Sequence, residues 1–137
     1  MKKITVKAKI DSLVDVMDFV NTELELHNFP ASAQDDLNLV VDEIFANITH
    51  YAYDTDDGFA EVSISVGETA VLRFEDTGKP YNPLDREEPD LDVPIEEREI
   101  GGLGIHFVKS VMDKVEYEYK DGKNILTVTK EGFDDTI

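Results

Sequence analysis

The spacing of hydrophobic positions changes several times along the chain, and each spacing predicts an element. Residues 4–10 alternate between apolar and polar, which predicts a strand. Apolar residues then recur at helical spacing over 13–24 and again from about 30 to 51, which predicts two helices. Alternation returns over 59–66 and 69–76, which predicts two strands joined by a tight turn.

The second half of the chain adds a loop, a helix and a hairpin. Residues 81–100 have no period and contain three prolines and eight acidic residues against two arginines, which predicts a long mobile loop. A helix is expected to begin at Gly102. Residues 115–120 and 124–130 then predict two strands that pair around Asp121-Gly122.

This order of elements predicts one α+β domain over residues 1–137. Strands that occur in adjacent, hairpin-capable pairs favour a mixed, mostly antiparallel sheet with helices on one face, a two-layer sandwich. Asp11 or Ser12 is expected to cap the first helix, and Ser32 and Asp35 are expected to help cap the second. No internal repeat and no second domain are apparent.

Composition narrows the classes of function. The 137 residues carry a formal net charge of −18, which argues against nucleic-acid or membrane binding and favours basic protein partners or simple solubility. The chain has no cysteine, so a zinc–thiolate site is excluded, and this composition fits a cytoplasmic protein. Neither a signal peptide nor a membrane span is expected.

Three short motifs carry the chemistry that the sequence suggests. Glu43 and Asn47 lie four residues apart, so they share one side of the second helix, at the edge of its apolar face. Asp76 ends a strand and precedes Thr77 and Gly78, and Gly101-Gly102-Leu103-Gly104 opens a helix. Each motif alone also fits a structural role: a solvated helix flank, a turn, or a hinge.

Together the motifs supply what a nucleotide site requires. Asn47 offers a neutral oxygen ligand for Mg²⁺, and Glu43 is a candidate general base. Asp76 can accept a hydrogen bond from the exocyclic amine of adenine, whereas guanine presents a carbonyl there. The backbone amides of the glycine run suit phosphate groups.

The motifs and their order resemble the GHKL ATPase superfamily over roughly residues 6 to 129. Glu43 and Asn47 match its N box, Asp76-Thr77-Gly78-Lys79-Pro80 its first glycine box, and Gly101-Gly102-Leu103-Gly104-Ile105 its second. The Asp-x-Gly-x-Pro-aromatic-x-Pro form of residues 76–83 is similar to the anti-sigma factor serine kinase branch, not to the larger relatives.

The resemblance implies a role for each residue. Asn47 holds the Mg²⁺ that bridges the phosphates of ATP, and Glu43 orients or deprotonates the attacking hydroxyl. Asp76 reads adenine, with Thr77 and Gly78 supporting a water or a close approach. The second glycine box binds phosphate beneath an ATP lid at 81–100, in which Arg98 is the best candidate for a phosphate contact. The strong acidity of this lid is a departure from the expected pattern.

The resemblance also implies an activity and partners. A protein of this branch phosphorylates a serine of a small anti-sigma factor antagonist protein, sequesters a sigma factor in another state, and acts as a homodimer. Two alternatives to a kinase stay open. The domain could be a non-catalytic switch in which ATP binding alone sets partner affinity, or a protein-interaction module with a vestigial pocket.

Overall fold

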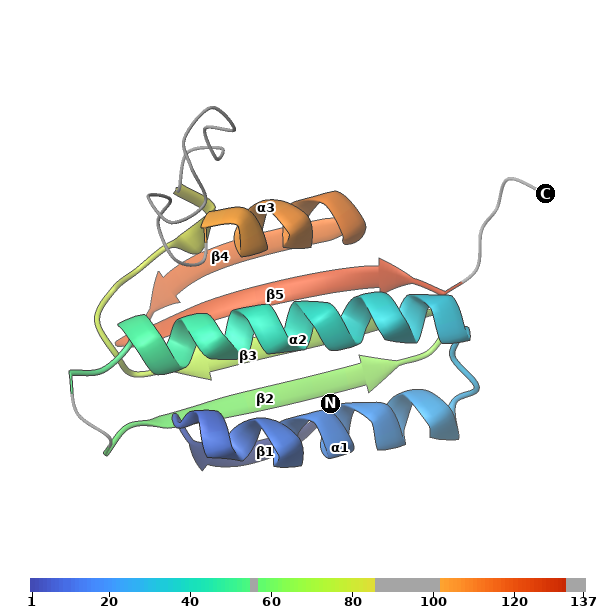
Figure 1. Cartoon of the computed structure of the whole chain (residues 1–137), viewed down its shortest axis with the longest axis horizontal. Coiled ribbons are helices and arrows are strands. Elements are labelled where there is room, and N and C mark those ends of the chain that lie inside the picture. Colours follow the sequence, from blue (N-terminus) through green and yellow to red (C-terminus); the bar gives the residue numbers. More distant parts are fainter. Residues whose placement is uncertain (55–56, 86–101, 133–137) are drawn as a thin grey trace.

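Five antiparallel strands form one sheet, and helices lie on one of its faces (Figure 1). The computed structural model describes residues 1–54, 57–85 and 102–132. In chain order the elements are β1 (Lys2–Lys7), α1 (Leu13–Leu26), α2 (Ala31–Tyr51), β2 (Phe59–Val66), β3 (Thr69–Asp76), α3 (Gly102–Val111), β4 (Lys114–Lys120) and β5 (Lys123–Glu131). Short 3₁₀ turns occur at Ile10–Ser12 and Pro83–Asp85.

The strand order β1-β2-β3-β5-β4 places two segments that are distant in sequence side by side. β3 pairs antiparallel with β5, and this register sets Asp76 opposite Asn124. β4 and β5 form a hairpin whose two turn residues, Asp121 and Gly122, have φ values of 55° and 79°. Positive φ at both positions is the type I′ geometry that the Asp-Gly pair favours.

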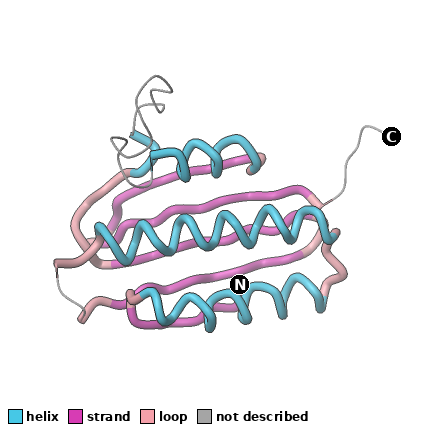
Figure 2. The backbone as a smooth tube through the Cα atoms, viewed as in Figure 1, coloured by secondary structure: helices cyan, strands magenta, loops and turns pink. Residues whose placement is uncertain are grey.

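One end of the sheet collects the segments that matter for function. The carboxyl end of α2, the segment after β3 and the β4–β5 turn all lie at this end (Figure 2). Because the strands alternate in direction, segments that are distant in the sequence meet there.

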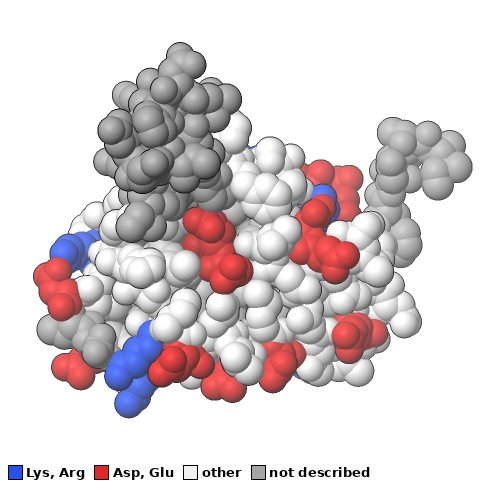
Figure 3. Space-filling view, in the orientation of Figure 1, with Lys and Arg blue, Asp and Glu red and all other residues white. Residues whose placement is uncertain are grey.

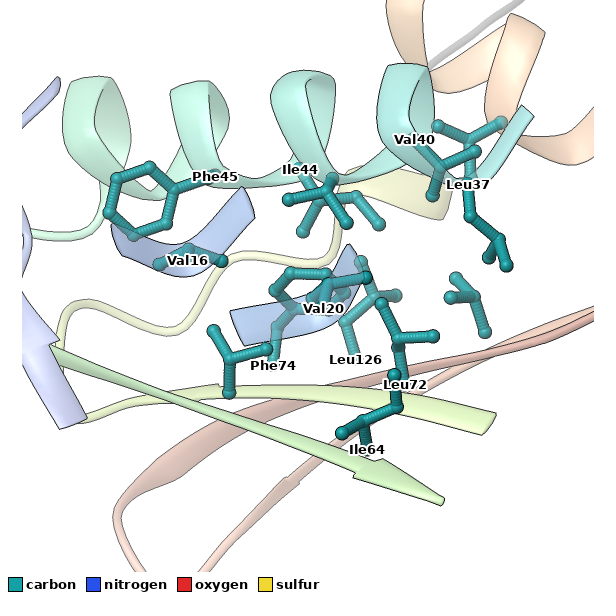
Figure 4. Packing of buried hydrophobic residues seen from close by; sticks show 14 of the residues in the cluster. Val16, Val20, Leu37, Val40, Ile44, Phe45, Ile64, Leu72, Phe74 and Leu126 are labelled. Carbon is teal, nitrogen blue, oxygen red and sulfur yellow. The ribbon is translucent and has the colours of Figure 1, made fainter. Parts of the chain in front are cut away.

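The core lies between the helices and the covered face of the sheet. The predicted apolar stripe of α2 is buried, and Val40 and Phe45 are buried beside it. Figure 4 shows side chains of α1 and α2 packed onto those of β2, β3 and β5. The stripe consists of Leu37, Val41, Ile44, Ile48 and Ala52.

The predicted fold class is confirmed, and every strand pair in the described sheet is antiparallel. The two central strands match their predicted bounds residue for residue. The first strand was predicted too far along the chain. β1 ends at Lys7, where its pairing with β2 reaches Phe59, and Ile10 lies in a 3₁₀ turn.

The predicted helix caps are wrong. Ser12 occupies the N-cap position of α1 with a helical backbone (φ −80°, ψ −9°) and forms no side-chain cap hydrogen bond. Such a backbone does not aim the hydroxyl at the first amides, because a capping residue normally has an extended conformation. Pro30 is the N-cap of α2 and cannot cap through its side chain.

The described helices include none with both the length and the hydropathy needed to cross a bilayer. Acidic side chains spread over the helical face, and few basic ones lie among them (Figure 3). The predicted loop at 81–100 falls outside the described residues beyond position 85, as do Arg98 and Gly101.

Candidate functional site

A cavity lies between the carboxyl-terminal half of α2 and the sheet. Its apolar wall is formed by Ile44, Ile48, Phe74 and Leu126. Three tyrosines, Tyr51, Tyr81 and Tyr117, and three polar residues, Asn47, Asp76 and Asn124, complete most of the lining. A slot with apolar walls and a few convergent polar groups is the usual form of a small-ligand site.

Asp76 is the buried acid of this cavity. Its side chain ends β3 and is 7% exposed. The Oδ1 atom accepts hydrogen bonds from the Gly78 amide and from Asn124 Nδ2, each at 2.9 Å. Burial raises the pKa of the Asp76 carboxyl, and these two donors partly offset that effect. No hydrogen bond from a described residue reaches Oδ2, so this oxygen is available to a ligand.

Gly78 follows Asp76 in a turn that lies against the end of α2. A Cβ atom at Gly78 would collide with the backbone of Ala52, so only glycine fits here. The next residue, Lys79, donates its amide to Ala52 O at 2.9 Å. Its ammonium group forms a 2.5 Å ion pair with Asp54.

Thr77 lies outside the cavity, on the other side of Asp76. Its amide donates to Tyr53 Oη at 2.9 Å, and its hydroxyl lies 3.2 Å from the same atom. Tyr53 Oη in turn donates to Phe59 O at 2.6 Å. Tyr53 therefore holds the start of β2 and the end of β3 together.

The rings of Tyr51 and Tyr81 form a stack at the cavity. Their ring centroids lie 5.5 Å apart with planes at 27°. Because both line the cavity, this stack adds flat aromatic surface to the apolar wall.

Glu43 and Asn47 project from the same side of α2, one turn apart, as predicted. Asn47 lines the cavity, whereas Glu43 does not. Glu43 is half-buried, and burial, followed by the nearby Asp42 carboxylate, raises its pKa. A glutamate with a raised pKa is better matched to proton abstraction near neutral pH.

The second glycine box is described in part. Gly102, Leu103 and Gly104 form the first turn of α3, so their backbone amides belong to a helix amino terminus. Gly101 and Arg98 lie outside the described residues. The sequence therefore placed the start of α3 correctly.

The histidines do not contribute to the cavity. His27, His50 and His106 are exposed. Within the described ranges, no group of three or more His, Cys, Asp or Glu side chains could hold a metal ion. A metal ion here would depend on Asn47 together with oxygens of a bound ligand and water.

Asn124 is the residue that sequence reasoning missed. A single asparagine two positions after an Asp-Gly turn reads as turn chemistry, and no spacing links it to Asp76. Only the pairing of β3 with β5 brings the two together.

An antiparallel sheet with helices on one face forms a two-layer α+β sandwich, and the cavity lies between its two layers. The chain belongs to the histidine kinase-like ATPase domain family, whose model matches residues 6–130. The resemblance drawn from the three motifs is thereby confirmed, and the family implies ATP binding.

A curated protein with a similar sequence is a kinase. The serine/threonine-protein kinase BtrW of Bordetella bronchiseptica is 29% identical over 96 residues, which cover 68% of this chain and 67% of that protein.

Solved structures share the fold. The crystal structure of the RsbU and RsbW domains of a Mycobacterium tuberculosis protein matches 96% of this chain with a TM-score of 0.63 and 12% identity. This chain spans only 32% of that larger one. The Acinetobacter baumannii histidine kinase AdeS matches 98% of this chain and 69% of its own, with a TM-score of 0.53 and 15% identity. The catalytic domain of histidine kinase ThkA matches 96% and 97%, with a TM-score of 0.52 and 10% identity.

Proposed function

We propose that this protein is a Mg²⁺-dependent, ATP-using serine kinase that phosphorylates a small antagonist protein of the anti-sigma type. The observation that carries the proposal is Asp76, a buried carboxylate with one oxygen held by internal donors and the other left for a ligand. Family membership and the likeness to a serine/threonine kinase support the same activity.

In this proposal the base of ATP enters the apolar slot beside the Tyr51–Tyr81 stack. Asp76 accepts a hydrogen bond from the exocyclic amine of adenine. Gly78 allows the turn to lie close to the base, and Thr77 supports that turn through Tyr53. Asn47 lines the cavity and Glu43 lies one turn before it on the same side of α2, so the phosphates would lie near Asn47 and the acceptor hydroxyl near Glu43.

The phosphate end of the site combines backbone and side-chain groups. The amides of Gly102, Leu103 and Gly104, with Gly101 before them, would bind the phosphates at the amino terminus of α3. Asn47 would hold Mg²⁺, which supplies neutralisation of phosphate charge. Arg98 would add a phosphate contact from the segment at 81–100, which we propose as the lid.

Transfer then requires one proton acceptor and good alignment. The serine oxygen of the antagonist forms a bond to the γ-phosphorus while the bond from that phosphorus to the β–γ bridging oxygen breaks. ADP leaves, and the serine proton passes to the Glu43 carboxylate. Positioning and charge stabilisation supply most of the catalysis in such transfers, so a single carboxylate suffices.

The wider proposal includes a homodimer that sequesters a sigma factor when it is not phosphorylating the antagonist. The negative surface, with a net charge of −18, would then face basic regions of a protein partner. A cytoplasmic location fits these partners.

One experiment separates the proposal from its two alternatives. The purified protein is incubated with Mg²⁺, labelled ATP and the candidate antagonist protein, and both nucleotide affinity and phosphoserine are measured. Phosphoserine on the antagonist supports the kinase. Tight ATP binding without transfer identifies a non-catalytic switch, and absence of nucleotide binding identifies a vestigial pocket; either result overturns the proposed activity.

A further inference from the structure

The Asn124 side chain connects the cavity floor to the segment at the cavity mouth. Its Nδ2 atom donates to Asp76 Oδ1 at 2.9 Å and to Lys79 O at 2.8 Å. Its Oδ1 atom accepts from the Tyr81 amide at 3.0 Å and from the Tyr117 hydroxyl. The residue is 7% exposed, so its side chain forms its hydrogen bonds with these neighbours and hardly any with water.

The neighbours fix which way the amide of Asn124 points. The Tyr81 amide can only donate, so it must face the oxygen of Asn124. The Lys79 carbonyl can only accept, so it must face the nitrogen. A flipped amide would lose both bonds, and therefore an N–H group of Asn124 always points at Asp76.

This orientation decides which oxygen of Asp76 remains for a ligand. Asn124 Nδ2 and the Gly78 amide both donate to Oδ1, so the carboxylate cannot rotate without losing two hydrogen bonds. Asp76 lines the cavity, and its Oδ2 accepts no hydrogen bond from a described residue, so Oδ2 is the oxygen that remains for a ligand. A donor to a carboxylate also favours its ionised form, which is the form that accepts from an amine.

We infer that Asn124 is the positioning residue for base recognition: it holds Asp76 with one oxygen toward the base and ties that carboxylate to residues 79–81 at the cavity mouth. The inference rests on the proposed nucleotide site and adds a determinant that none of the three motifs contains. Asn124 acts through Asp76, and its function is to select a base that presents an amine.

Several ionisable groups surround Asp76 and must be kept constant in any test. Lys79, Tyr51, Tyr81 and Tyr117 line the cavity. Glu61, Glu75 and Lys123 line the hollow on the other side of Asp76. None of the substitutions below changes these residues.

The test compares two nucleotides that differ at the atom Asp76 would read. ADP presents an amine there, and inosine diphosphate presents a carbonyl oxygen. Calorimetry gives the affinity of each nucleotide. Both nucleotides carry the same diphosphate, so the effect of its titration cancels in the ratio of the two affinities. Asn124→Leu removes the donor at similar volume, and we expect it to lower the ADP preference about tenfold or more.

Thr127→Val is the matched control. Thr127 lies three residues further along β5 and lines a hollow away from the cavity, so this substitution removes a polar group from the same strand without touching Asp76. We expect its nucleotide preference to equal that of the wild type.

Asn124→Asp distinguishes positioning from mere packing, because it keeps the shape of the side chain. In this variant the new carboxyl group faces that of Asp76, and such a pair shares a proton. While the pair holds that proton, the protonated carboxyl group can still donate a hydrogen bond to the other one. We expect the ADP preference of Asn124→Asp to fall as pH rises and the pair loses that proton. The wild type should show no such loss at rising pH.

A measurement without nucleotide keeps this inference separate from the proposed function. Carbon-13 NMR of the Asp76 carboxyl should show a higher pKa in Asn124→Leu than in the wild type or Thr127→Val. If the wild type binds neither nucleotide, the proposed function fails, and the pKa alone decides whether Asn124 holds Asp76.

The inference is overturned if the wild type prefers ADP and both Asn124 variants keep that preference at every pH. An unchanged Asp76 pKa in Asn124→Leu overturns it as well. If Asn124→Leu does not fold, Asn124→Asp supplies the decision, since a preference independent of pH in that variant contradicts the positioning role.

Discussion

Gly78 lies directly against the carbonyl oxygen of Ala52, so the turn after β3 and the end of α2 touch without room for a side chain. The amide of Lys79 seals this contact with a 2.9 Å hydrogen bond to the same oxygen. The position of Asp76 relative to α2 therefore depends on a glycine two residues away.

Gly78→Ala should destabilise the fold and weaken nucleotide binding. The added Cβ would press on backbone, which cannot move aside as a flexible side chain can, and overpacking of this kind costs about 1–3 kcal/mol. Thermal unfolding and ADP calorimetry measure the two effects. Gly67→Ala is the control, because nothing lies within 4 Å of a Cβ there. Equal unfolding temperatures for the two variants would contradict the tight contact.

Asp76→Asn should reverse the base preference and not simply weaken binding. The Gly78 amide and Asn124 Nδ2 would hold the new amide by its oxygen, which turns its NH₂ group toward the base. The amine of ADP then faces another donor, with which it cannot form a hydrogen bond. The carbonyl oxygen of inosine diphosphate faces the same donor and can accept from it. We expect ADP affinity to fall about tenfold to a hundredfold while inosine diphosphate gains relative to it. Calorimetry that shows equal ADP and inosine diphosphate affinity for the wild type would reject Asp76 as the base reader.

The same substitution should not destabilise the protein near neutral pH. Burial raises the pKa of Asp76 in the folded state, so the folded protein binds this proton more tightly than the unfolded chain does. Wild-type stability from this group is therefore greatest at low pH and is lost as pH rises through the raised pKa. We expect Asp76→Asn to unfold at an equal or higher temperature at pH 7, with a difference that shrinks as pH falls. Calorimetric unfolding at several pH values measures it.

Glu43→Gln should keep ATP binding and lose phosphoryl transfer. The amide preserves the shape of the side chain but cannot accept the serine proton, and loss of a general base typically costs about 10² or more in rate. Wild-type transfer should also decline at low pH, beginning above the range of an ordinary glutamate because the pKa of Glu43 is raised. Transfer by Glu43→Gln at a rate near the wild type would show that another group takes the proton.

Tyr53→Phe should affect stability more than binding. The hydroxyl of Tyr53 holds both Phe59 O and the Thr77 amide, but Tyr53 does not line the cavity. Loss of these bonds should cost about 1–3 kcal/mol of unfolding free energy, with ADP affinity nearly unchanged. Chemical denaturation and calorimetry provide the comparison. A large loss of affinity at normal stability would instead assign Thr77 a direct part in binding.

The segment at 81–100 should respond to nucleotide. In the proposed lid, we expect the mutual repulsion of its eight acidic residues to be overcome only when its contacts with the phosphates of bound ATP form. Hydrogen exchange should therefore slow in residues 84–98 when Mg²⁺ and ATP are added, and ADP should slow it less. Identical exchange with and without nucleotide would remove the lid assignment and favour a partner-binding surface.

Much of the fold could be predicted because its patterns are local. β3 alternates strictly between buried and half-buried residues, and β2 departs from alternation only at the buried Ser63, so the alternating sequence pattern located both strands. The end of β1 could not be located this way, because it depends on its antiparallel partner. The last residue of β1, Lys7, pairs with the first residue of β2, Phe59.

The site was predictable to the extent that its residues lie in short motifs. Asp76 and Gly78 were found from the first glycine box and Asn47 from the N box, and the structure places all three at or beside the cavity. Asn124 was not found, since each of its partners lies between 7 and 48 residues away. The hydrogen bonds of Tyr53 are also set by tertiary structure, and its position after the N box did not reveal them.

The cavity draws its walls from α2, β3, β4 and β5, and the last wall residue in sequence is Leu126, which lies in β5. A growing chain therefore cannot form a complete pocket until β5 has left the ribosome. Any ligand of the pocket binds only the assembled domain, so its binding energy adds to the stability of the whole domain. Nucleotide supply would then influence how long a newly made copy survives cellular proteases.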